Sequence, residues 1–147
     1  MNSAHLHLLI NHIPVLAMLF SLLLLLYGLI RDSGEVKRAA LGGIVLAALT
    51  AVPSYFSGEA AQTRVEAMPV TDAQVEMHEE AAETAVVFTG LAGAIALVGL
   101  WAGRRSERLP RWTIILTLLL ALGATALLAR TANLGGQIRH TEIRPVP

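Results

Sequence analysis

The sequence predicts an all-α protein, an integral membrane four-helix bundle with both termini on the outer (periplasmic) side. Two observations predict this class. Hydrophobic residues make up 54% of the 147 residues and the mean hydropathy is +0.60, which is high for a soluble domain. Four apolar stretches, 13–30, 39–57, 84–103 and 112–129, approach the roughly 20 residues that cross a bilayer core.

These stretches predict four helices in a single transmembrane domain that covers residues 1–147. The helices are expected near residues 12–30, 37–60, 72–103 and 110–132. Pro14 suits the first turn of the first helix, where a missing N–H costs nothing. We expect this helix to remain in the membrane rather than act as a secretory signal, because its apolar run is long and no Lys or Arg precedes it.

Local signals predict where the third and fourth helices begin and end. Thr71 and Gln74 have the spacing of a capping box, which predicts a helix start near Asp72. Gly135 and Gly136 are expected to stop the fourth helix, so that the chain turns and His140 folds back over the bundle.

The basic residues predict the orientation of the bundle. Seven of the eleven lie in the two connections that face the same side: Arg31, Lys37, Arg38, Arg104, Arg105, Arg108 and Arg111. The positive-inside rule makes that side cytoplasmic. Both termini and the connection 58–83 then face outward from a bacterial cytoplasmic (inner) membrane. Eight of the eleven acidic residues also fall on the outer side, most of them as a solvated face.

All five histidines fall on the same predicted outer side. His5, His7 and His12 precede the first apolar stretch, His78 precedes the third, and His140 follows the fourth. Small residues follow His78 at helical spacing: Ala82, Ala85, Thr89, Ala92 and Ala96. Such a stripe leaves room for a flat porphyrin. It equally suits close packing of membrane helices, and both interpretations stay open.

Three short motifs span the chain: His7, His12 and Pro14 with their spacing, His78 near a helix start, and the closing LGGQIRH at 134–140. Together they resemble the small bacterial membrane proteins known as domain of unknown function 2231. Leu8 stands where that family often has proline, and IRHTE replaces its usual Tyr-Arg-His-Gly ending. The resemblance implies the four-helix architecture and a role for the histidines, without an activity. Some relatives look fused to, or encoded beside, redox modules such as Rieske-type domains, so the resemblance implies electron transfer.

The histidines and the lack of cysteine favour a b-type haem site near the outer face. His12 and His78 are the first candidate pair of iron ligands, with His7 and His140 as a second pair. Arg130 and Arg139 are candidate partners for the haem propionates. The chain would then be a cytochrome b-like electron-transfer protein or subunit rather than a stand-alone enzyme. Quinol, an outward-facing redox protein or a larger complex would be its partner.

Two alternatives remain open. A His/Glu site could bind copper or zinc, although Glu76 and Glu83 are expected to face away from His78. A cofactor-free accessory subunit could use the histidines for assembly or as a pH sensor. No phosphate-binding loop or nucleophile elbow is present in the sequence, and the basic residues fit the topology, so nucleic-acid binding is not expected.

Overall fold

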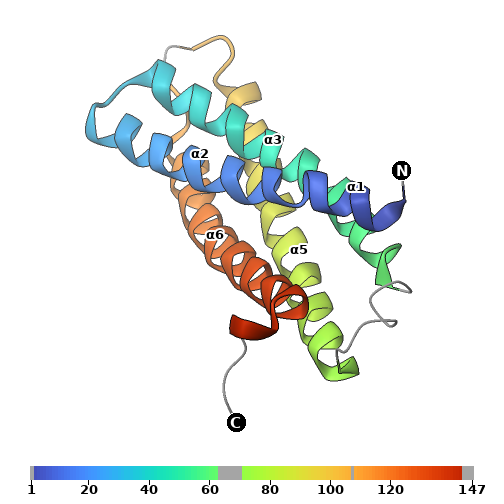
Figure 1. Cartoon of the computed structure of the whole chain (residues 1–147). Helices are drawn as coiled ribbons and strands as arrows, with labels where there is room; N and C mark the ends of the chain where they lie inside the picture. The colour runs from blue at the N-terminus through green and yellow to red at the C-terminus, as the bar shows by residue number, and fades with distance from the viewer. Residues whose placement is uncertain (1, 63–70, 107, 144–147) are drawn as a thin grey trace.

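Five α-helices and a short 3-10 helix account for most of the chain that the computed structural model describes, which is residues 2–62, 71–106 and 108–143 (Figure 1). They are α1 (Ser3–Ile10), α2 (His12–Ile30), α3 (Gly34–Glu59), α5 (Asp72–Ala102), α6 (Arg111–Arg139) and η1 (Thr141–Ile143). Within these residues, four spans are long and apolar enough to cross a membrane, and α1 with α2 forms one of them. The predicted set of four membrane helices is confirmed.

The first span is broken at Asn11. Asn2 caps α1 by accepting a hydrogen bond from the His5 N–H at 2.9 Å, and the chain resumes as α2 at His12. Pro14 has no N–H to donate into the preceding turn, which favours a break at this place. The structure therefore adds a short helix, α1, that the apolar pattern did not predict.

The starts of α3 and α5 follow from their capping residues. Ser33 precedes α3, and its side chain accepts a hydrogen bond from the Val36 N–H at 3.3 Å, so the helix begins three residues earlier than predicted. At α5, the Thr71 N–H donates to Gln74 Oε1 at 3.2 Å. The predicted start at Asp72 is confirmed.

The predicted stop at the glycine pair is wrong, because α6 continues through both glycines to Arg139. A Cβ on Gly135 would lie 2.9 Å from the ring of His78, and one on Gly136 would lie 3.5 Å from Ile143. Gly135 therefore leaves space for the His78 ring inside the helix instead of ending it, whereas a Cβ on Gly136 would make only an ordinary contact. The chain turns later, at His140 and η1.

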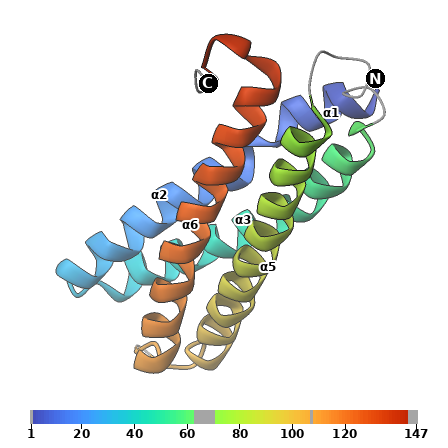
Figure 2. The same cartoon turned by 90° about the horizontal axis from the view of Figure 1, so that it is seen from below.

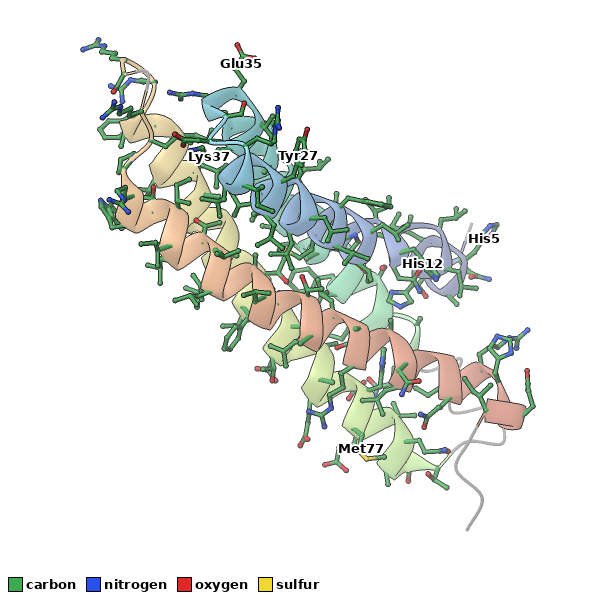
Figure 3. The ribbon with its side chains drawn as sticks, turned by 90° about the vertical axis from the view of Figure 1, so that its left-hand side faces the viewer. His5, His12, Tyr27, Glu35, Lys37 and Met77 are labelled. Atoms are coloured by element: carbon green, nitrogen blue, oxygen red, sulfur yellow. The ribbon has the colours of Figure 1, made fainter. Side chains whose placement is uncertain are left out.

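The helices form two antiparallel hairpins, α1–α2 with α3 and α5 with α6 (Figures 1 and 2). The hairpins cross at an angle, with α3 packed along α5. The contact between α2 and α6 is much less extensive. Both termini and the start of α5 lie at one end of the bundle, here called the histidine end. Figure 3 shows His5, His12 and Met77 at this end and Glu35 and Lys37 at the other, the basic end.

Small side chains fill most of the space between the hairpins. Met18, Leu25, Leu41 and Ile44 are the largest fully buried apolar residues of the core. Leu22, Ile114 and Leu128 are also buried, and most of the other buried residues are alanine and threonine. A Cβ on Gly93 would overlap that of Ala48, so α3 and α5 approach at this point as closely as their backbones allow. Lipid supplies no hydrophobic drive to bring helices together, and close contact between small residues replaces it.

Arg38 joins the two hairpins at the basic end. Its guanidinium donates hydrogen bonds to the carbonyls of Gly103 at 3.0 Å and Ser106 at 2.6 Å, just beyond the end of α5. Carbonyls at a helix C-terminus carry partial negative charge and lack partners within the helix, so a cation there is stabilising.

We expect Arg38→Gln to lower the free energy of unfolding by about 1–2 kcal/mol, because two charge-assisted hydrogen bonds between the hairpins are lost. Reversible unfolding in mixed micelles measures this change. Arg105→Gln is the matched control, since Arg105 is exposed and has no described partner. Equal stability of the two variants would contradict the assigned role of Arg38.

The turn between α2 and α3 predicts a pH effect. Asp32 has a φ of 46°, and a hydrogen bond from Lys37 at 2.6 Å lowers the pKa of its carboxyl. A lowered pKa means that the carboxylate stabilises the fold at neutral pH and that this contribution disappears as the pH falls through the folded-state pKa. We expect Asp32→Asn, which tolerates the same backbone conformation, to be slightly less stable at pH 7. The difference should shrink as the pH falls below about 3.8, the ordinary pKa of the carboxyl, and vanish below the lowered folded-state pKa, as a thermal melt at each pH would show.

Candidate functional site

A cavity of about 770 Å³ opens at the histidine end of the bundle. Toward this end the two hairpins diverge from the point at which they cross (Figure 2). Its walls come from α1, the start of α2, the end of α3, the start of α5 and the end of α6. This volume lies in the range of sites that bind cofactors and other small molecules. All helices of the bundle therefore contribute to one site.

His7 is fixed against the end of α3. Its Nδ1 lies 2.9 Å from the carbonyl oxygen of Ser54 and 3.3 Å from Ser57 Oγ, and a Cβ on Gly58 would lie 2.9 Å from its ring. Because a carbonyl can only accept a hydrogen bond, Nδ1 carries the proton and donates it. In this tautomer Nε2 keeps its lone pair.

His78 is fixed against the end of α6 in the same way. Its Nδ1 donates to the carbonyl oxygen of Thr131 at 3.1 Å, and its ring lies against Gly135. The neutral ring again presents Nε2 as a free acceptor. His7 and His78 line the same cavity.

The two hairpins thus contain the same structural unit. In each, a histidine near the start of the hairpin bonds a main-chain carbonyl, and the glycine under its ring follows that carbonyl by four residues. The units are His7 with Ser54 and Gly58, and His78 with Thr131 and Gly135. Histidines that bind metals usually donate their other ring N–H to a carbonyl or carboxylate, which fixes the tautomer and the direction of the ring. Both units have this arrangement.

The other predicted site residues differ in their positions. His12, His140 and Arg139 also line the cavity, but their side chains are exposed, and His140 Nδ1 lies 2.8 Å from a carboxylate oxygen of Glu142. Arg130 is exposed and is not among the residues that line the cavity. The geometry therefore favours His7 over His12 as the partner of His78, because only His7 is fixed by a hydrogen bond to the backbone.

The stripe of small residues below His78 has two uses along its length. Ala82 and Ala85 line the cavity, whereas Thr89, Ala92 and Ala96 are fully buried between helices. The interpretation as a helix contact is right for the lower part, and no room for a flat ligand remains there. The cavity is confined to the region around the histidines.

Acidic residues form one side of the cavity. Glu59, Glu76, Glu79, Glu80 and Glu83 all line it. Lining the same cavity does not bring Glu76 or Glu83 to His78, so their orientation away from it stays a prediction. Within the described residues, no three His, Asp or Glu side chains are grouped so that they could hold a metal ion.

Two tryptophans at the basic end indicate where the cavity lies relative to the membrane. Trp101 and Trp112 are 65% and 56% exposed there, in positions typical of a membrane interface. Counting roughly 20 helical residues, the span of the hydrocarbon core, leads from Trp101 back to Ala81 and from Trp112 on to Ala132. His78 and Gly135 lie within one turn of those positions, so we infer that the cavity lies at the membrane surface.

Ser54, Gly58 and Thr131 contact the two histidines but were not predicted as site residues from the sequence. The signal that would have found them is the repeated spacing of Ser or Thr followed four residues later by Gly, at the end of each hairpin's second helix. This spacing places both residues on the same helix face, next to the helix that carries the histidine.

We expect Gly135→Ala to displace the His78 ring and to lower the free energy of unfolding by about 1–3 kcal/mol, because the new methyl group overlaps the ring. Nitrogen NMR of the histidines would report the lost bond to Thr131. Gly90→Ala is the matched control, since nothing lies within 4 Å of its Cβ, and alanine there should stabilise the helix by roughly 0.5–1 kcal/mol. If both variants changed the free energy of unfolding with the same sign and size, the contact between Gly135 and the His78 ring would be refuted.

Comparison with protein-family models, with curated proteins and with solved structures found no match. The resemblance to domain of unknown function 2231 therefore stays a prediction from the motifs around His7, His78 and His140. The functional argument depends on the two histidine units and on the cavity that they line.

Proposed function

We propose that this chain is a cytochrome b-like electron-transfer protein or subunit that binds a b-type haem between His7 and His78. The observation that carries the proposal is the repeated histidine unit. Each ring donates its Nδ1–H to a carbonyl and keeps Nε2 free, and both rings line one cavity. Two neutral imidazoles from facing helices are the usual axial ligands of such haems.

The residues present fit this cofactor. Haem iron needs only two protein ligands, so the lack of a cluster of three donors among the described residues is no obstacle. The cavity volume of about 770 Å³ suits a ligand of drug size or somewhat larger. The sequence has no cysteine, so the group would be held by the two imidazoles and by packing. When bound, it supplies reversible one-electron transfer.

Arg139 and Arg130 differ in whether they could pair with a haem propionate. Arg139 lies at the rim, where it can pair with a propionate, whereas Arg130 lies outside the cavity. The negative charge of the glutamates that line the cavity would repel the haem propionates. The propionates would therefore lie near Arg139 and His140.

The position of the histidines limits the electron partners. Both lie at the histidine end, so electrons would enter and leave the chain at that end instead of crossing the bilayer. Quinol in the membrane, or a redox protein outside it, are the proposed partners, within a larger complex or alone. The basic end would face the cytoplasm of a bacterial inner membrane, with both termini periplasmic.

A copper or zinc site is the second candidate, because glutamates line the same cavity as the histidines. It would require rearrangement, since no three such donors are grouped among the described residues. A cofactor-free accessory subunit of a membrane complex is the third candidate. Each of the three predicts a different content of haem and metal in the purified protein.

The first experiment is an absorption spectrum of the protein purified gently from haem-replete cells, oxidised and then reduced, with haem and metal analysis of the same sample. We expect a Soret band and a sharp reduced α-band. Both should be lost in His7→Ala and His78→Ala and kept in His5→Ala, a control outside the cavity. In His12→Ala, retention of the bands supports His7 as the ligand and loss supports His12. A sample free of haem would overturn the proposal, and its metal content would then separate the two other candidates.

A further inference from the structure

A second hollow lies on the outer side of α3 and α5, next to the cavity. It has a volume of about 340 Å³ and is formed by one face of each helix. Its lining residues are Val52, Tyr55, Phe56, Glu83, Val86 and Val87. Val52, Phe56 and Val87 are exposed apolar side chains of membrane helices, so this side of the hollow faces lipid. We refer to it as the lateral groove.

The lateral groove and the histidine cavity share three residues. Tyr55, Glu83 and Val86 line both, so these side chains separate the lipid-facing groove from the space around His7 and His78. A molecule in the groove would therefore lie on the membrane side of the proposed haem site, one layer of side chains away from it.

The shared residues give the inner end of the groove its chemistry. Tyr55 offers a hydroxyl that can donate or accept a hydrogen bond, and Glu83 offers a carboxylate. Within the described part of the chain, neither group has a hydrogen bond or an ion pair. Glu83 lies at the membrane edge by the same count of residues that places Ala81 there. A carboxylate at this edge can be reached both from the lipid-facing groove and from the cavity, because Glu83 lines both.

We propose that the lateral groove binds a quinol, a lipid-soluble hydroquinone. Its polar ring fits the end formed by Tyr55 and Glu83, and its apolar tail fits the exposed side formed by Val52, Phe56 and Val87. An acyl chain would match the apolar walls but would leave the hydroxyl and the carboxylate without partners. This inference deepens the proposed function by naming the electron donor and its position.

The reaction at this site balances with two one-electron acceptors. A quinol loses two electrons and two protons as its two O–H bonds break and it becomes the quinone. A haem held by His7 and His78 would supply the one-electron acceptor, used twice per quinol, and each electron would leave to an acceptor outside the membrane. The Glu83 carboxylate accepts each proton in turn and releases it to water through the cavity, which it also lines.

Binding is tested directly with the protein in lipid nanodiscs and short-tailed benzoquinone and naphthoquinone as probes, using calorimetry and mapping of an azidoquinone cross-link. We expect saturable binding and cross-links on α3 and α5. Val87→Trp should weaken binding at least about tenfold by filling the groove. Val98→Trp is the matched control, because Val98 is an exposed residue of the same helix outside the groove. Affinity no greater than in empty nanodiscs, or equal affinity in both variants, would overturn the proposal.

Glu83→Gln separates binding from proton transfer. The variant should bind the probe with an affinity within about threefold of that of the original chain, because glutamine keeps an oxygen that can accept a hydrogen bond. Reduction of the haem by the quinol form of the probe should be about 100-fold slower, as expected for loss of a general base. An unchanged rate of reduction would refute the role of Glu83. Haem without quinone binding would overturn this inference and leave the proposed function intact. Quinone binding without haem would leave the groove intact and overturn the proposed function.

Discussion

The absence of a side chain at Gly58 and Gly135 is the constraint on which the site depends. At each position an imidazole lies against the bare backbone of a neighbouring helix, close enough to bond a main-chain carbonyl. Such a bond fixes the tautomer, the direction of the ring and the position of Nε2 at once. A methyl group at either glycine would change all three.

Small residues have opposite effects in the two halves of the bundle. In the middle and toward the basic end, alanines and glycines let the hairpins approach until no space remains, as Gly93 and Ala48 illustrate. At the histidine end the hairpins separate, and the same residue types leave a cavity. The position along the crossing hairpins therefore decides whether small residues bring helices together or leave space.

The sequence was sufficient to predict the four long helical spans, but it did not predict the contacts that distinguish His7 from His12. The apolar stretches and the capping residues around Asp72 predicted the spans, because a bilayer sets helix length and a cap sets helix start. The continuation of α6 through Gly135 and the selection of His7 both depend on contacts between distant segments. A pattern read along one helix does not show that the ring of His78 occupies the space that Gly135 leaves.

Each hairpin contributes one complete histidine unit, and this division has a consequence for biosynthesis. The second unit needs Thr131 and Gly135 near the end of α6, which leaves the ribosome after the other helices described here. A nascent chain that has inserted only α1, α2 and α3 has His7 in place with nothing opposite it. Any ligand that bridges the two histidines must therefore be inserted after α6 has been translated. A truncated or stalled chain would be a membrane protein without a site.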